Sequence, residues 1–158
     1  MLKTNTNRKS EGFTIIEVLI VLAIAGLIML LVFLAVPALQ RNSRNTARKQ
    51  DISRIGGAVT DFTSNNNGTL PVTANNAAIL NSAGTLSQYT ATSPLPIQTG
   101  TQSPLTNAQL NNYRIVTGAK CDTAVAGGTT ASGATTRQVA VQYMVETSGS
   151  PTPVCQDL

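Results

Sequence analysis

The sequence contains no His and no Trp, only two Cys, and few charged residues, which make up 11% of the chain. Without His, the sequence cannot form a triad with a His base, a His-ligated zinc site or a His proton shuttle near neutral pH. Two Cys are too few for a site of four thiolates. We therefore expect no enzymatic activity, no cofactor and no metal site.

The charged residues are concentrated at the front of the chain. Residues 1–61 contain eight of the eleven Lys and Arg residues and four of the seven acids, whereas residues 62–158 are neutral. Nucleic-acid binding by a folded face requires clustered basic residues with aromatic platforms, and the C-terminal part has neither. The length of 158 residues suits a single globular domain.

One apolar run is long enough to cross a membrane. Residues Val18 to Val36 include nineteen positions without a polar side chain, which span close to the ~30 Å of a bilayer core at about 1.5 Å per residue. A secretory signal peptide has a shorter apolar region followed by small residues at a cleavage site. We therefore predict a retained transmembrane helix. Basic residues flank the run on both sides, so they do not fix its orientation.

Glu17 lies near the start of this run. An ionised carboxylate in hydrocarbon costs several kcal/mol unless it is paired. Glu17 either reaches the headgroup region from the helix end, or it meets a cation on another chain. The next basic residue along the helix is Arg41, so the second interpretation implies a partner subunit.

Residues 9–26, KSEGFTIIEVLIVLAIAG, resemble the N-terminus of type IV pilins and pseudopilins. The matching features are a short basic leader that ends at Gly12, Phe13 as the next residue, a glutamate five residues into the mature chain (Glu17) and a long apolar helix. The resemblance implies that a prepilin peptidase cleaves between Gly12 and Phe13 and methylates the new amino group of Phe13. Because cleavage precedes the apolar run, the mature protein keeps its membrane helix.

The same resemblance implies that Glu17 is an assembly residue. In a helical fibre of identical subunits, the amine of Phe13 in one subunit supplies the cation for Glu17 of a neighbour. Gly26 and Pro37 are expected to delimit a kinked or flexible stretch, since proline removes a backbone donor. Pro37 lies later than the family pattern places its helix proline, and close helix packing is an equal explanation for Gly26.

The helix is predicted to continue to residue 63. Ile52, Ile55, Val59 and Phe62 form one apolar stripe, and the cluster NNNG at residues 65–68 ends the helix.

A second stripe on this helix is basic, with Arg41, Arg44 and Arg48 at i, i+3 and i+7. It is either a solvated face beside lipid headgroups or a contact with acids of a neighbouring subunit, such as Asp51 or Asp61.

The remainder of the chain is rich in Thr, Ser and Asn but contains short apolar elements. Short helices are predicted at residues 75–82 and 106–112, strands at 113–117 and 138–146, and a loop at 127–133. Val139, Val141, Tyr143 and Val145 share one face of the second strand. These elements fit a small antiparallel sheet packed on the apolar stripe, an α+β head that the pilin resemblance also implies.

Cys121 and Cys155 enclose the stronger strand. A segment exported past a membrane helix meets oxidising conditions, which favour a disulfide over two free thiols. The pair also resembles the C-terminal disulfide-bounded region of pilins. Such a bond would stabilise the fold by about 3–4 kcal/mol.

The predicted organisation has four parts: a removed leader at residues 1–12, an apolar assembly helix at 13–39, a head-packing half of the helix at 40–63 and a head at 64–158. By the resemblance, the protein is a prepilin. It would start in the cytoplasmic membrane, in contact with the lipid bilayer, the prepilin peptidase and the assembly machinery. It would then polymerise with identical or related subunits into a surface pilus for attachment, twitching motility or DNA uptake. The alternatives are a pseudopilin or minor pilin of a type II secretion-like system, and a single-pass membrane protein with a binding or hydrolytic domain.

Overall fold

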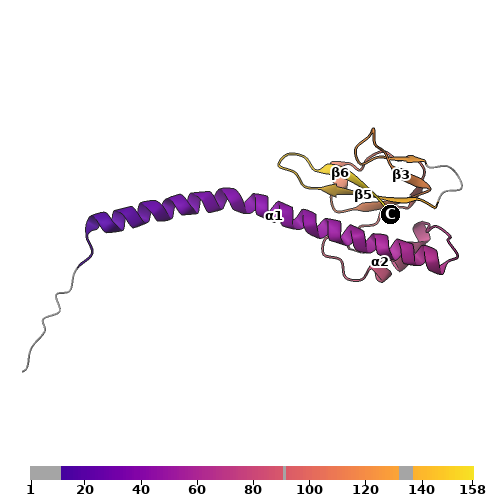
Figure 1. The fold of residues 1–158 in the computed structure, drawn as a ribbon, viewed down its shortest axis with the longest axis horizontal. Coiled ribbons are helices and arrows are strands. Elements are labelled where there is room, and N and C mark those ends of the chain that lie inside the picture. The colour runs from indigo at the N-terminus through magenta and orange to yellow at the C-terminus, as the bar shows by residue number, and fades with distance from the viewer. Residues whose placement is uncertain (1–11, 91, 132–136) are drawn as a thin grey trace, which may run out of the picture. The chain divides into compact units, whose positions relative to one another are not determined.

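The computed structural model of the chain describes residues 12–90, 92–131 and 137–158 (Figure 1). Its first element is the 51-residue helix α1, Ile15–Asn65. Asn67 and Gly68 follow it with φ angles of 53° and 78°, and the N–H of Gly68 donates to the carbonyl of Thr63 at 2.8 Å. Asn and Gly adopt this left-handed backbone at helix C-termini most readily. The predicted end of the helix within residues 65–68 is therefore confirmed.

The chain divides into two compact units, residues 1–38 and 39–158. The described part of the first unit is the apolar half of α1 with the three residues before it. All its side chains are exposed, including Phe13 at 86%. The helix continues through both Gly26 and Pro37.

The second unit contains one four-stranded and one two-stranded sheet. The four strands stand in the order β1-β2-β5-β6; their bounds are Gln98–Thr99 (β1), Tyr113–Thr117 (β2), Val139–Val145 (β5) and Thr152–Asp157 (β6). The second sheet pairs β3 (Ala119–Cys121) with β4 (Thr129–Ala131). Together with α1 they form the predicted α+β fold.

The predicted strands at residues 113–117 and 138–146 are confirmed as β2 and β5, which pair antiparallel with Val141 opposite Ile115. The sheet is not purely antiparallel, because β1 pairs parallel with β2. A parallel pair needs a connection of about a dozen residues, and the segment between Thr99 and Tyr113 supplies it.

The structure differs from the predictions at four other strands, of which β3 (Ala119–Cys121) was not predicted at all. Strand β4 lies inside the segment 127–133, which the sequence indicates as a loop, and β6 is absent from the prediction. Prolines at both 151 and 153 weaken the sequence signal of β6. Strand β5 is buried on both faces rather than one, because it is central and Gln142 on its second face donates to the carbonyls of Ser103 and Gly127.

The short helices lie close to their predicted positions. Helix α2 is Asn76–Ala83, preceded by the 3-10 turn η1, Thr73–Asn75. The helix predicted at residues 106–112 is only a 3-10 turn, η2, Asn107–Gln109.

The core of the second unit lies between its part of α1 and the four-stranded sheet (Figure 1). Ile52, Ile55 and Val59 of the predicted stripe are in it, whereas Phe62 is only half-buried. The other buried side chains of this core come from α2, from the four-stranded sheet, from the segment that connects α2 to the sheet, and from α1 itself. These side chains are Ile79, Tyr89, Tyr113, Ile115, Val139, Val141, Tyr143 and Ala58.

Gly56 of α1 allows the C-terminal residue to approach the helix. A Cβ at this position would lie 2.6 Å from Leu158 Cδ2, whereas a Cβ on the neighbouring Gly57 would meet nothing within 4 Å. The N–H of Leu158 donates to the carbonyl of Val139 and continues the β5–β6 ladder. No sequence pattern had predicted a contact between Gly56 and Leu158.

Strand β6 is one edge of the four-stranded sheet. Backbone N–H groups point alternately to the two sides of a strand. Since the N–H of Leu158 points to β5, the backbone nitrogens of residues 153, 155 and 157 point away from β5, to the open edge of the sheet. Residue 153 is proline and has no N–H. Residue 155 is a disulfide cysteine, and the backbone of Gly127 lies against Pro153 with no room for a Cβ.

Candidate functional site

The first candidate site is the N-terminal end of α1. Gly12 and Phe13 precede the helix, are exposed, and have no regular secondary structure. A Cβ on Gly12 would meet nothing within 4 Å. No described part of the chain therefore crowds Gly12 beside the peptide bond to Phe13. The predicted leader falls on residues 1–12, of which 1–11 lie outside the described residues.

Thr14 and Glu17 cap the first turn of α1. The carboxylate Oε2 of Glu17 accepts the backbone N–H of Thr14 at 2.8 Å and its hydroxyl at 2.7 Å. The N–H of Glu17 donates to Thr14 Oγ1 at 3.3 Å. This is the reciprocal capping box of Thr-x-x-Glu, in which two helix-end donors are satisfied and the carboxylate lies at the positive end of the helix.

The capping box changes the account of Glu17 that the sequence suggests. Within the described chain, its carboxylate accepts two hydrogen bonds from Thr14 but forms no ion pair. Thr14 is not among the site residues predicted from the sequence, although a threonine three residues before a glutamate at a helix start is itself a recognisable signal.

The helix that follows has the composition of a membrane span. Within the described residues, α1 is the one helix that is long and apolar enough to cross a membrane, by length and composition alone. Its large apolar side chains from Ile15 to Val36 are all exposed. A Cβ on Gly26 would meet nothing within 4 Å, so no described part of the chain packs closely against this residue.

The second candidate site is the contact between the basic stripe and the residue after β5. Arg44 Nη2 lies 2.6 Å from Glu146 Oε2, and Arg48 Nη1 lies 2.7 Å from Glu146 Oε1. Asn45 exchanges two hydrogen bonds with the backbone of Glu146, at 2.7 and 2.8 Å. Arg41 donates to the carbonyl of Thr147. Four residues on one helix face thus fix α1 to the end of β5.

This geometry differs from both interpretations of the basic stripe, a solvated face and a contact with acids of a neighbouring subunit, because the stripe contacts Glu146 and Thr147 of its own chain. Arg48 is only 3% exposed and pairs with Glu146 of its own chain. Asp51, named as an acid for a neighbouring subunit, is 1% exposed and accepts the backbone N–H groups of Ser87 and Gln88. Asp61 is exposed. The sequence could not indicate the role of Glu146, because it lies about a hundred residues from its partners.

The electrostatics of Glu146 follow from this contact. The hydrogen bonds from Arg44 are the largest cause that lowers the pKa of the Glu146 carboxyl to about 2. Burial is the second-largest effect and opposes them, whereas the hydrogen bond from Arg48 and the charges of both arginines lower the pKa further. Glu146 is therefore ionised at all ordinary pH values.

Cys121 and Cys155 form the predicted disulfide, with an S–S distance of 2.04 Å. It joins β3 to β6, and Asp157 Oδ1 accepts the N–H of Cys121 beside it. Among the described residues, these three side chains are also the group closest to a metal-site arrangement. Both sulfurs are in the disulfide, so they offer no thiolate.

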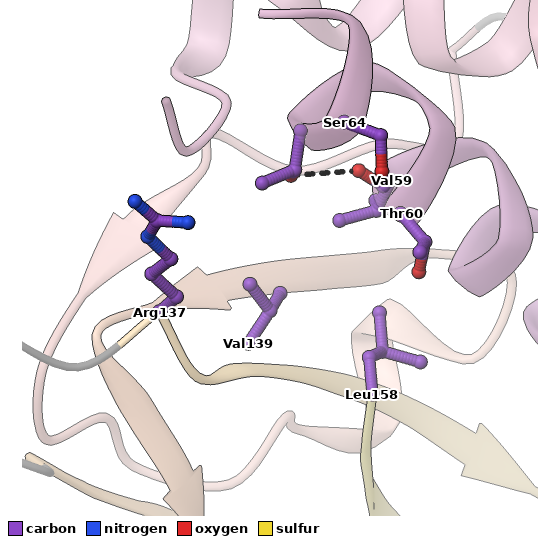
Figure 2. A pocket seen from close by; sticks show the side chains of 7 residues that line it. Val59, Thr60, Ser64, Arg137, Val139 and Leu158 are labelled. Atoms are coloured by element: carbon purple, nitrogen blue, oxygen red, sulfur yellow. Dashed lines mark hydrogen bonds between the residues drawn. The ribbon is translucent and has the colours of Figure 1, made fainter. Parts of the chain in front are cut away.

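A pocket of about 210 Å³ opens between the end of α1 and the start of β5 (Figure 2). It is lined by one cation, three hydroxyls and three aliphatic side chains: Arg137, Thr60, Thr63, Ser64, Val59, Val139 and Leu158. The hydroxyls of Thr60 and Thr63 donate to carbonyls of their own helix. The lining residues therefore include no nucleophile paired with a base.

Comparison with known proteins supplies one match. The family model for the prokaryotic N-terminal methylation motif matches residues 7–33, which contain the Gly12–Phe13 bond, Glu17 and all but the last three residues of the apolar run. Neither the curated proteins nor the solved structures give a significant match. The chain therefore carries at residues 7–33 the prokaryotic N-terminal methylation motif, which is the signature of type IV pilins and pseudopilins.

Proposed function

We propose that this protein is a prepilin whose mature form is the structural subunit of a type IV pilus. The observation that carries the proposal is the arrangement at the start of α1, where the exposed residues Gly12 and Phe13 precede a capped first turn and a fully exposed apolar helix. An apolar surface of this extent is unstable in water, so it requires lipid before assembly and other subunits after it.

In the proposed filament, the apolar halves of α1 pack together and the heads cover the outside. Removal of residues 1–12 frees the amine of Phe13, which becomes N-methylated. Glu17 of one subunit then pairs with the amine of a neighbour, and this pairing fixes the axial register of the helices. The subunit has no enzymatic role in this proposal; cleavage, methylation and the force for extension are supplied by other proteins.

The filament would act outside the cell in attachment, twitching motility or DNA uptake. The disulfide between Cys121 and Cys155 favours a pilin exposed to the exterior over a pseudopilin, because it stabilises a small head under oxidising conditions. A minor pilin or a pseudopilin of a type II secretion-like system is the second candidate, and it shares the same processing.

Mass spectrometry of filaments sheared from cells tests this proposal. We expect an N-terminal peptide that begins with N-methylated Phe13 and a disulfide-linked peptide pair that contains Cys121 and Cys155. An abundant subunit indicates a major pilin, and a trace amount indicates a minor one. Absence from filaments, with a processed protein in the membrane, would favour the pseudopilin. A protein that retains residues 1–12 in surface fibres would contradict the proposal.

A further inference from the structure

Four buried side chains near the middle of the second unit each contain a polar atom without a hydrogen-bond partner. Arg48, Asp51, Tyr89 and Tyr113 are at most 3% exposed. Five enclosed side-chain atoms in the described part of the chain lack a partner, and four of them are Arg48 Nε, Asp51 Oδ1, Tyr89 Oη and Tyr113 Oη. Since a buried polar group without a partner costs about 1–3 kcal/mol, this concentration calls for a common explanation.

The four residues are neighbours in space. Arg48 and Asp51 lie three residues apart on one face of α1. Asp51 Oδ2 accepts the N–H of Gln88 at 2.6 Å, which brings the next residue, Tyr89, to the helix. The rings of Tyr89 and Tyr113 meet edge to face with centroids 5.3 Å apart. Burial is the main reason that the pKa of Tyr89 is raised, and Arg48, Tyr143, Asp51 and Tyr113 also act on it, in that order of size.

The other polar atoms of this cluster are already bonded. The two terminal nitrogens of Arg48 donate to Glu146 and Asn111, and Asp51 Oδ2 accepts two backbone N–H groups. The four remaining atoms comprise one obligate donor, Arg48 Nε, one obligate acceptor, Asp51 Oδ1, and two hydroxyls that can act either way. A water molecule accepts two hydrogen bonds and donates two, so these four atoms match its full capacity.

We propose that Arg48 Nε, Asp51 Oδ1, Tyr89 Oη and Tyr113 Oη together bind one ordered water molecule. The water accepts from Arg48 and from one tyrosine, and it donates to Asp51 and to the other tyrosine. Buried waters of this kind typically make about three hydrogen bonds to groups that would otherwise be unsatisfied. The site joins α1, the segment before β1 and strand β2, and it does not depend on filament assembly.

Other ligands fit this site poorly. A metal cation would face the guanidinium of Arg48, and only one carboxylate oxygen is free to bind it. Direct contact with a larger molecule is also disfavoured, because the four polar atoms themselves are almost completely enclosed.

Two substitutions test the proposal in the full chain in detergent, Tyr89→Phe and Tyr113→Phe. If each hydroxyl bonds the water, each change should lower the folding equilibrium constant about 3- to 10-fold. The double variant should lower this constant by less than the product of the two single fold-changes, since both hydroxyls bind the same water molecule. If the hydroxyls bond nothing, both changes should raise that constant. Tyr143→Phe is the control, because Tyr143 lies opposite Tyr113 on the neighbouring strand and acts on Tyr89, but its hydroxyl is not among the enclosed unpartnered atoms.

A crystal structure of the full chain at about 1.5 Å resolution decides the question directly. We expect one density peak within about 3.2 Å of at least three of the four atoms. A direct bond from Tyr89 Oη to Asp51 Oδ1 with no such peak overturns the proposal, whatever the stability of the Phe variants.

Discussion

Glu17 has an observed role as a cap and a proposed role in assembly, and single-atom changes can separate the two. As a cap, its oxygen accepts hydrogen bonds from Thr14; in the proposed filament, its charge would meet an amine of another subunit. Glutamine can replace glutamate in a capping box but carries no charge. Valine at position 14 removes the hydroxyl and leaves the carboxylate intact.

We therefore expect Glu17→Gln to keep the helix start and to abolish filaments, whereas Thr14→Val should weaken the cap by about 1 kcal/mol and still assemble. The measurement is the filament yield after shearing, with membrane-bound subunit as the control for expression. Normal filaments from Glu17→Gln would show that the charge is not needed.

Glu146 makes the stability of the head depend on pH in the acid range. Its pKa is depressed to about 2 in the folded protein, against about 4.3 in an unfolded chain. The stabilisation is therefore complete above about pH 5 and is lost as the pH falls towards 2. Because Arg44 is largely exposed, we expect a contribution of about 1–2 kcal/mol rather than the full linkage value.

Urea unfolding at a series of pH values measures this contribution. Glu146→Gln should remove the part of the acid dependence between about pH 5 and 2 and should destabilise the head at neutral pH, because Arg48 loses a charged partner while it stays buried. Asp61→Asn is the matched control, since Asp61 is an exposed acid on the same helix. Equal effects of the two substitutions would contradict the assignment.

At the scale of elements, two adjacent glycines in α1 have opposite functions. Gly57 faces open space, so Gly57→Ala should stabilise the helix by about 0.5–1 kcal/mol. Gly56 faces Leu158, so Gly56→Val should destabilise the head by up to about 1 kcal/mol, since its side chain would displace the partly exposed side chain of Leu158. Thermal unfolding of both variants checks the prediction, and equal shifts would remove the basis for the contact between Gly56 and Leu158.

The disulfide is the second prediction at this scale. Replacing Cys121 and Cys155 together by Ala releases β6 from β3, and it should cost about 3–4 kcal/mol by the chain-entropy estimate. Reduction of the native protein should give a similar loss in urea unfolding, whereas the double variant should be insensitive to reductant. A loss below about 1 kcal/mol would show that strand pairing alone holds β6.

Local signals predicted the elements that depend on local chemistry. Alternating Val residues identified β5, and the Asn-Gly cluster identified the end of α1. The sequence did not predict the strands that depend on pairing with other segments of the chain. Strand β6 contains a proline and forms only beside β5, and β1 has two residues that carry no periodic pattern.

The candidate sites divide in the same way. Gly12, Phe13 and Glu17 lie within one short motif, so sequence alone identified them. The contact of Arg44 and Arg48 with Glu146 joins residues 102 and 98 positions apart, and no periodicity connects them. The sequence left the three arginines as either a solvated face or a contact with a neighbouring subunit, because it does not show which side of α1 meets the sheet.

At the scale of the whole molecule, the two units lead to a prediction about solubility. All the core residues lie in the second unit, from Ile52 onward. We expect residues 39–158, exported to an oxidising compartment, to fold as a soluble protein with the native disulfide and the Glu146 contact. Circular dichroism and mass spectrometry measure the fold and the disulfide. Aggregation of this fragment under those conditions would show that the apolar helix is needed for the head to fold.

The edge of β6 has a consequence for a fibre that repeats it many times. Heads held side by side in a filament have a very high effective concentration, which would drive any open strand edge to pair with its neighbour. Here Pro153 has no backbone N–H to donate, Gly127 lies against Pro153, and the disulfide links Cys155 to β3. This edge therefore resists fusion between heads, so that in the proposed filament subunit contacts made elsewhere, rather than sheet extension, would determine the order of the subunits.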